Sequence, residues 1–179
     1  APGCVIDDGA QPGPDSACLV FPVGTDATSA ALDAGLDPRR TLAIDPLFMD
    51  SHISLMGTPI TAQPYRDAVW AALGHGGASV TLIRDSAGCV AQRVVAMIVN
   101  IGCDIAQQRI ATPTDIDAAV TLGLGYPQGP LALGDRLGAT TVLTILDRLH
   151  AFYRDPRYRP SPWLVRRARL GVSLLTPES

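Results

Sequence analysis

The sequence predicts a protein in two parts, a small α/β unit followed by an all-helical unit. Residues 17–83 follow the order strand, helix, strand, helix, strand, and from residue 84 onward the apolar residues recur at helical spacing. The composition of 47% hydrophobic and 17% charged residues over 179 positions is typical of a chain that buries a core. We therefore divide the chain into a linker (1–16), an α/β unit (17–83) and a helical unit (84–179).

Residues 1–16 are predicted to be a linker. Three glycines and three prolines stand among acidic residues in this segment, and such a composition cannot bury a core. We expect folded structure from Ala17 onward.

The α/β unit is predicted from three short apolar segments that two helical segments separate. The expected strands cover 18–23, 41–48 and 79–83, and the expected helices run from 25 or 26 to 33 and from 63 to 73. The segment before the second helix is expected to be a loop. This order of elements is typical of a small parallel sheet with crossover helices.

The helical unit is predicted to begin with a long helix that Asp85 or Ser86 caps. Its apolar side chains recur at three- and four-residue steps: Val90, Val94, Met97, Ile98, Ile101 and Ile105. A second stripe at helical spacing carries polar and small side chains: Gln92, Ala96, Asn100, Cys103 and Gln107. This second stripe either lines a cleft or faces solvent, and the spacing favours neither.

Three further helices are expected. Thr112, Pro113 and Asp115 are typical of a capping box at the start of the first, which Gly123 and Gly125 end. A short helix is expected over 131–137. The last helix carries apolar residues at helical spacing: Val142, Ile145, Leu146 and Leu149.

The charged residues exclude several kinds of chemistry. Because the chain has no lysine, a Schiff base, a lysine general base and a phosphate-loop lysine are excluded. The single glutamate is Glu178, the second-last residue. A net charge of −3 gives no electrostatic surface for nucleic acid, and no apolar run approaches the roughly 20 residues of a membrane helix. We therefore expect a soluble protein without nucleic-acid or membrane partners.

Neither the histidines nor the cysteines are spaced as metal ligands. The histidines stand far apart, at 52, 75 and 150, and the four cysteines, at 4, 18, 89 and 103, form no C-x-x-C pair. We predict no metal site and no disulfide framework. Reduced thiols are typical of the cytoplasm, which is the expected location.

Three local patterns were weighed as possible ligand or catalytic sites. Gly24 follows the first strand, but G-x-G-x-x-G is absent, so no dinucleotide site is predicted. Ser86 lacks the G-x-S-x-G surroundings of a nucleophile, and we interpret it as a helix cap. Arginines gather near the C-terminus, at positions 154, 157, 159, 166, 167 and 169. They could form a solvated face, a surface between subunits or a binding site for a phosphate-bearing ligand, and the sequence does not choose among these.

Several motifs of the second half stand in a specific order. They are RDSAGCVAQR (84–93), ATPTDID (111–117), LGLGYPQGP (122–130), DPRY (155–158) and PSP (160–162). In this order they resemble the C-terminal helical domain of 3-hydroxyacyl-CoA dehydrogenases. The resemblance implies that the α/β unit is a reduced Rossmann-like domain, as found between the two helical domains of longer bacterial 3-hydroxybutyryl-CoA dehydrogenases.

The resemblance also implies positions for the family's functional residues. The family uses a histidine base that a glutamate orients. Matching through Arg40 and Leu55 without gaps places the histidine on Asp45 and the glutamate on Gly57, so no catalytic residue is expected here. The family's substrate-contacting asparagine is matched by Gln92, and Ser86 and Asn100 are further candidates for substrate binding.

The function implied is that of a C-terminal portion of an NAD-dependent 3-hydroxyacyl-CoA dehydrogenase. Such an enzyme oxidises 3-hydroxyacyl-CoA to 3-oxoacyl-CoA in fatty-acid or aromatic-acid degradation. NAD would be bound by a domain upstream of Ala1, with no cofactor on this chain. This segment alone is expected to be inactive, to cover the acyl-CoA cleft of the catalytic domain and to form a homodimer. The alternative is a stand-alone, non-catalytic acyl-CoA-binding or scaffold module.

Overall fold

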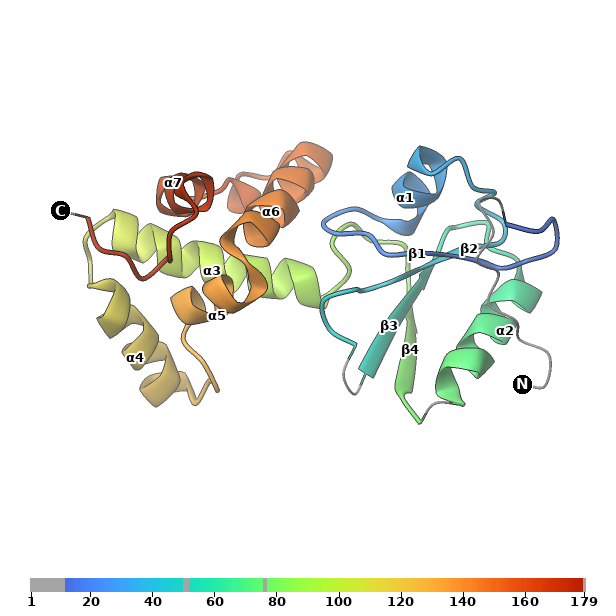
Figure 1. Ribbon diagram of the computed structural model, residues 1–179, viewed down its shortest axis with the longest axis horizontal. Coiled ribbons are helices and arrows are strands. Elements are labelled where there is room, and N and C mark those ends of the chain that lie inside the picture. Colours follow the sequence, from blue (N-terminus) through green and yellow to red (C-terminus); the bar gives the residue numbers. More distant parts are fainter. Residues whose placement is uncertain (1–11, 50–51, 76, 179) are drawn as a thin grey trace. The chain divides into compact units, whose positions relative to one another are not determined.

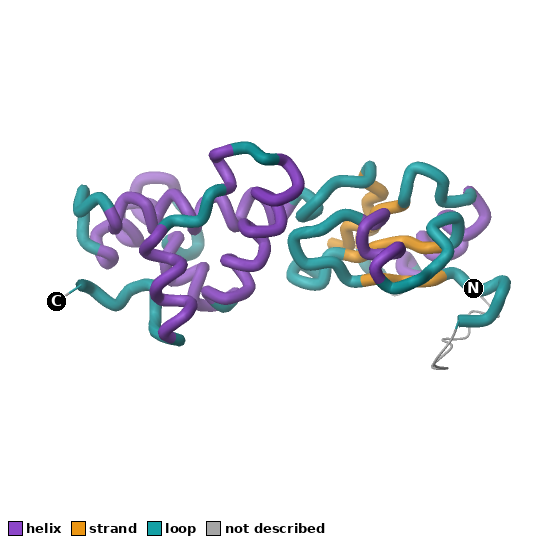
Figure 2. Tube along the Cα trace, turned by 90° about the horizontal axis from the view of Figure 1, so that it is seen from above, coloured by secondary structure: helices purple, strands orange, loops and turns teal. Residues whose placement is uncertain are grey.

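The computed structural model describes residues 12–49, 52–75 and 77–178, which form two compact units, Ala1–Val90 and Ala91–Ser179. Figure 2 shows that the strands of the described chain belong to the first unit and that the second is helical. The α/β plus all-α class predicted from the sequence is therefore confirmed. Residues 1–11 of the predicted linker lie outside the described residues.

The first unit, called the sheet unit below, is a four-stranded sheet with helices (Figure 1). Its elements in chain order are β1 (Cys18–Val20), α1 (Ala27–Asp33), β2 (Thr41–Ile44), β3 (His52–Gly57), α2 (Gln63–Gly74) and β4 (Ser79–Ile83). The spatial order is β1-β2-β3-β4. Pairs β1–β2 and β3–β4 are parallel, but β2–β3 is antiparallel.

The expectation of a wholly parallel three-stranded unit was therefore wrong. The segment expected as a loop contains β3, and β2 ends at Ile44 rather than at Phe48. Pro46 cannot donate a ladder hydrogen bond, which explains the early end of β2. The short connection from Ile44 to His52 cannot form a parallel crossover, because that needs a dozen or more residues, so the two strands pair as a hairpin.

Each face of the sheet carries a buried hydrophobic cluster. One hydrophobic cluster contains Ala27 of α1 with Ala43, Met56 and Cys89. The cluster on the other face contains Val69 of α2 with Leu42, Ile44 and Leu55. Since neighbouring strand residues point to opposite faces, β2 contributes to both clusters and is covered by a helix on each side.

The second unit, called the helical unit, is arranged around α3 (Ala91–Gln107), which contacts four other helices. These are α4 (Pro113–Leu124), α5 (Pro130–Leu137), α6 (Ala139–Tyr153) and α7 (Pro162–Leu170), with a short 3-10 turn, η1, at Pro156–Tyr158. The predicted capping box is confirmed, because Thr112 Oγ1 accepts from the Asp115 N–H at 3.2 Å. Gly125, at φ 68°, ends α4 as expected.

The predicted start of the long helix was wrong. Helix α3 begins at Ala91, because Gly88 and Cys89 have φ values of 73° and 46° and so cannot belong to a right-handed helix. The Asp85 carboxylate instead accepts from the N–H groups of Ala27 (2.8 Å) and Thr28 (3.2 Å). Asp85 therefore caps α1 of the sheet unit rather than α3.

The two stripes of α3 also have unexpected surroundings. The polar and small stripe faces the interior of the helical unit: Gln92, Ala96, Asn100 and Cys103 are all buried, together with Val99, Gly102 and Ala106. From the apolar stripe, Val94 is 50% and Ile101 is 53% exposed. The longest helix of this unit thus has an apolar outer face. No helix in the described ranges is long and apolar enough to cross a membrane.

Candidate functional site

The first candidate position, Asp45, lies directly after β2. It is completely buried, its N–H donates to the Ser54 carbonyl at 3.3 Å, and its Oδ1 accepts from the Leu47 N–H at 3.0 Å. The carboxylate thus stabilises the turn that leaves β2. This contact has a structural purpose and needs no substrate.

Gly57, the second candidate position, is not brought close to Asp45. Gly57 pairs with Leu42, so the two positions are three residues apart along the ladder, roughly 10 Å at 3.3 Å per residue. A side chain at Gly57 would point at Thr61, whose Oγ1 would lie 3.3 Å from the added Cβ. With an aspartate at 45 and a glycine at 57, the two positions carry neither a histidine base nor a glutamate that could orient it.

The residue opposite Asp45 on β3 is Ser54. With the pair Ile44–Leu55 as the next rung, Asp45 and Ser54 face each other across β2 and β3. Neither Asp45 nor Ser54 is an imidazole, so this end of β2 has no histidine base.

The start of α1 bears on dinucleotide binding. In a Rossmann unit the pyrophosphate lies at the N-terminus of the helix after the first strand. Here the Asp26 carboxylate accepts from the Ser29 N–H at 2.7 Å, while Asp85 accepts from Ala27 and Thr28. Two carboxylates therefore take the N–H groups that a phosphate would use, and their charge repels it. The residues present at this turn do not fit a dinucleotide.

Asn100, a candidate for substrate binding, is used inside the helical unit. It is buried, its Nδ2 donates to the Arg159 carbonyl at 3.0 Å, and its Oδ1 accepts from the Ser161 N–H at 2.8 Å. These two bonds fix the turn that precedes α7. The amide is directed at main chain rather than at a ligand.

The other two candidates belong to different units. Ser86 is in the sheet unit, and its N–H donates to the Met56 sulfur at 3.1 Å. Gln92 is in the helical unit and is 1% exposed. Within each unit, the described contacts do not gather these candidates around a common space.

The sheet unit has a surface hollow of about 440 Å³ that the sequence did not indicate. It lies where β3 and β4 end and α2 begins, and its lining includes Gly57, Thr61, Arg66 and Arg84. Both threonines of the β3–α2 turn are bonded to main-chain carbonyls, Thr58 to Pro38 at 2.9 Å and Thr61 to Thr41 at 3.1 Å. The hydroxyls of this hollow are therefore engaged in folding the turn.

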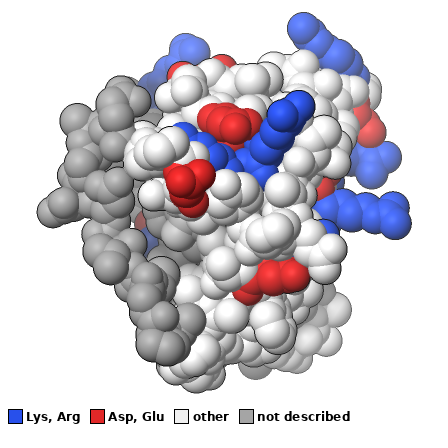
Figure 3. All heavy atoms as spheres, turned by 90° about the vertical axis from the view of Figure 1, so that its right-hand side faces the viewer, with Lys and Arg blue, Asp and Glu red and all other residues white. Residues whose placement is uncertain are grey.

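The charged and metal-binding side chains do not form a separate site in the described part of the chain. On the face shown in Figure 3, basic and acidic side chains are interspersed rather than separated by sign. No group of three His, Cys, Asp or Glu residues in the described ranges could hold a metal ion. Among the described residues, Cys18, Cys89 and Cys103 are buried and form no disulfide, and Cys4 lies outside the described residues.

Helices α3 and α4 both carry exposed apolar side chains. In addition to Val94 and Ile101, Leu122 and Leu124 of α4 are exposed, and Ile116 is the buried residue of that helix. Ala119 of the same helix is also exposed. Val94 and Ile101, two helical turns apart on α3, define what we call the outer apolar face.

In comparisons with known proteins, the sequence matches lie mainly in the helical unit. Residues 88–173 match the family model described as 3-hydroxyacyl-CoA dehydrogenase, C-terminal domain. The chain is 44% identical over 98 residues to the 3-hydroxyadipyl-CoA dehydrogenase of Escherichia coli K12, covering 55% of this chain and 21% of that protein. It is 35% identical over 95 residues to a probable 3-hydroxybutyryl-CoA dehydrogenase of Bacillus subtilis, covering 53% of this chain and 33% of the relative.

Solved structures extend the similarity over most of the chain. The crystal structure of an Escherichia coli K12 3-hydroxybutyryl-CoA dehydrogenase superposes with a TM-score of 0.77 at 31% identity, covering 87% of this chain and 32% of that one. A Ralstonia eutropha (S)-3-hydroxybutyryl-CoA dehydrogenase has a TM-score of 0.81 at 22% identity, covering 93% and 62%, and shows the fold alone. The chain thus spans from a fifth to a third of the length of the curated relatives named above.

Proposed function

We propose that the chain is the C-terminal portion of an NAD-dependent 3-hydroxyacyl-CoA dehydrogenase, because residues 88–173 match the model of the C-terminal domain of that family. The parent enzyme would oxidise short 3-hydroxyacyl-CoA substrates to 3-oxoacyl-CoA in the cytoplasm. NAD would be held by a domain upstream of Ala1. The curated relatives are named as dehydrogenases of 3-hydroxyadipyl-CoA and 3-hydroxybutyryl-CoA, and each is longer than the segment that it shares with this chain.

The chain itself supplies no catalytic base in this proposal. Oxidation of a 3-hydroxyl needs a group that takes the hydroxyl proton while hydride leaves for the nicotinamide, and histidine is suited to this near neutral pH. None of the three histidines replaces it: His52 starts β3 and is exposed, His75 follows α2, and His150 is in α6. The residues at the end of β2 bond to main chain instead.

The role that we assign to the chain is association, through the outer apolar face, and covering of the parent's acyl-CoA cleft. The observation that carries association is the orientation of α3, which buries its polar stripe and exposes Val94 and Ile101. Large apolar side chains that lie together on a surface mark sites of protein association. A second copy that presents the same face would form a homodimer.

Association is tested by sedimentation equilibrium on the full chain. The double variant Val94→Glu/Ile101→Glu is expected to weaken dimerisation by at least about tenfold, because it places two charges in an apolar contact. The control is Leu32→Glu, an exposed leucine of the sheet unit, which should leave assembly unchanged. Equal assembly of wild type and the double variant would reject the outer apolar face as the interface.

Activity is tested separately with acetoacetyl-CoA and NADH. The chain alone should oxidise no NADH, whereas the longer parent chain should do so. Turnover by the chain at the rate of a normal dehydrogenase would contradict the loss of the catalytic pair. Tight acyl-CoA binding by the isolated chain, abolished by Gln92→Ala, would instead favour the stand-alone acyl-CoA-binding module.

A further inference from the structure

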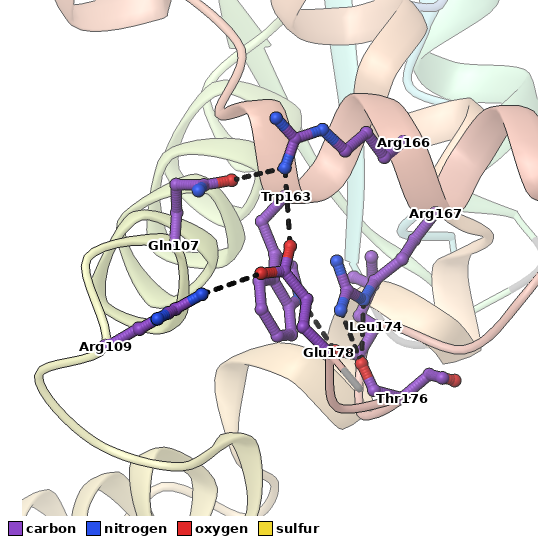
Figure 4. A network of polar contacts seen from close by, with 8 residues as sticks. All are labelled: Gln107, Arg109, Trp163, Arg166, Arg167, Leu174, Thr176 and Glu178. Atoms are coloured by element: carbon purple, nitrogen blue, oxygen red, sulfur yellow. Dashed lines mark hydrogen bonds and ion pairs between the residues drawn. The ribbon is translucent and has the colours of Figure 1, made fainter.

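The C-terminal segment, residues 172–178, lies against the helices of its own unit (Figure 4). It follows Gly171, which ends α7 at φ 66°. Leu174 is completely buried, and a Cβ added at Gly134 of α5 would lie 2.5 Å from its Cδ1 and 2.6 Å from Cγ1 of Val99 on α3. Gly134 therefore leaves the space that the leucine side chain fills.

Side chains of α5 and α7 bind the main chain of this segment. Asp135 accepts from the Leu174 N–H at 2.8 Å, and Trp163 Nε1 donates to the Leu174 carbonyl at 2.9 Å. Arg167 donates from Nε and Nη2 to the Thr176 carbonyl at 2.9 and 2.6 Å. Hydrogen bonds to main-chain groups, combined with a pocket for one apolar side chain, are a common way in which proteins bind peptides.

Arg167 depends on the segment for its hydrogen bonds. It is 5% exposed, its guanidinium carbon lies 3.1 Å from the centroid of the Trp163 ring, and burial lowers its pKa from the ordinary value. A buried cation that loses its acceptors is costly, so the Thr176 carbonyl stabilises this site. Farther along, Glu178 meets Arg166 at 3.3 Å and Arg109 at 3.9 Å, but these pairs are exposed and contribute little.

We propose that Gly134, Asp135, Trp163 and Arg167 form a peptide-binding groove for a Ser-Leu-x-Thr turn, and that residues 172–178 occupy it as a latch that opens while the helices stay folded. The turn is closed by the Thr176 N–H, which donates to the Ser173 carbonyl at 3.1 Å. The latch contacts its own unit through the groove and through one bond near its start, from the Val172 N–H to the Arg167 carbonyl. Near its end, Glu178 adds the exposed ion pairs with Arg166 and Arg109. Opening at Gly171 breaks these contacts and leaves the packing of α3 against α4 and α6 in place. Segments of this kind open with less free energy than global unfolding.

Cys103 reports on this opening. It lies on the buried face of α3, and the charges of Arg167 and Asp135, both groove residues, act on its thiol. Burial raises the pKa of Cys103 to about 12, so the closed form holds an unreactive thiol. When the latch opens, water reaches the groove and the thiol becomes accessible to a labelling reagent.

The first experiment measures the rate at which a thiol reagent labels Cys103 in the full chain, resolved by peptide mass spectrometry. Leu174→Ala should raise this rate by about tenfold or more, because it removes the side chain that anchors the latch. Cys89 is the internal control: it is buried in the sheet unit, and its rate should stay constant. Unchanged Cys103 labelling in Leu174→Ala would overturn the latch.

The second experiment asks whether the groove binds peptide supplied from outside. A synthetic GVSLLTPES peptide (residues 171–179), at about 1–5 mM to compete with a tethered segment, should restore protection of Cys103 in Leu174→Ala. The same peptide with the leucine of position 174 replaced by alanine should not. Equal protection by both peptides, or by neither, would overturn the peptide-binding groove.

A milder variant separates opening from loss of fold. Trp163→Phe removes the hydrogen bond to the Leu174 carbonyl and keeps an aromatic ring under Arg167. It should raise Cys103 labelling by about threefold to tenfold with unchanged far-UV circular dichroism. If labelling in this variant rises only together with loss of helical signal, opening is global and the latch does not exist.

Discussion

The sheet unit and the helical unit differ in how their central elements use apolar side chains. In the sheet unit every residue of β2 is buried, with hydrophobic clusters on both faces. In the helical unit α3 buries glutamine, asparagine and small residues, while Val94 and Ile101 are about half exposed. Strand β2 is therefore packed on both faces, whereas α3 leaves apolar side chains exposed on its outer face.

The two units also use charged side chains in a similar way. Asp26 and Asp85 bind the first N–H groups of α1, and Asp135 and Arg167 bind the main chain of the C-terminal segment. In both units, charged side chains therefore stabilise the fold by binding main-chain groups.

The largest expected effect contrasts a residue of each unit. Leu42→Ala should lower the free energy of unfolding of the sheet unit by ~2–5 kcal/mol, because it leaves a cavity in a completed core. Ile101→Ala should lower that of the helical unit by less than ~1 kcal/mol in dilute monomer, since its side chain is half exposed. Urea unfolding measures both. Similar losses in the two variants would break the comparison.

A smaller effect is expected at the cap of α1. Asp85→Ala should destabilise the sheet unit by ~1–3 kcal/mol, because the N–H groups of Ala27 and Thr28 lose a charged acceptor. Asp67→Ala is the matched control, since that exposed carboxylate has only a 3.7 Å ion pair with Arg66. Chemical denaturation should show almost no change for the control. If both variants lose the same stability, the capping role of Asp85 is refuted.

The smallest expected effect is the change in the free energy of unfolding of the helical unit per unit of pH. Burial raises the pKa of Cys103 from 9.0 to about 12, so the folded state holds its proton more tightly than the unfolded state. The stabilisation is complete below pH 9 and is lost as the pH rises toward 12, by about 1.4 kcal/mol per pH unit. Urea unfolding at pH 8 and 10 should show this loss in wild type and less of it in Cys103→Ala. An equal loss in both would assign it to other groups.

Local features of the fold were predictable because their partners are close in sequence. The Thr112–Asp115 capping box joins residues three positions apart, and it was predicted correctly. The cap that Asp85 provides was missed because its partner, Ala27, is 58 positions away. The residue pattern alone gave no strand at β3, because the pairing of β3 with β2 depends on a hairpin and not on a clear alternation of its own residues.

The candidate site was predictable to a more limited degree. Residue types alone showed that Asp45 and Gly57 offer no histidine and no glutamate. Which positions face each other depended on the strand register, which sets Asp45 opposite Ser54. The use of Asn100 as a brace for the turn before α7 likewise depends on residues 59 and 61 positions away.

The sequence by itself determined the chemistry that this chain lacks and the spacing of its helices. A chain without lysine and with its single glutamate at position 178 cannot form a Schiff base or supply a glutamate from its core, whatever its fold. Only the tertiary structure decided which stripe of α3 faces inward. Small residues there let the neighbouring helices come close: a Cβ at Gly102 would lie 3.0 Å from Pro130. Close packing therefore selected the small and polar stripe for the interior and left the larger apolar side chains outside.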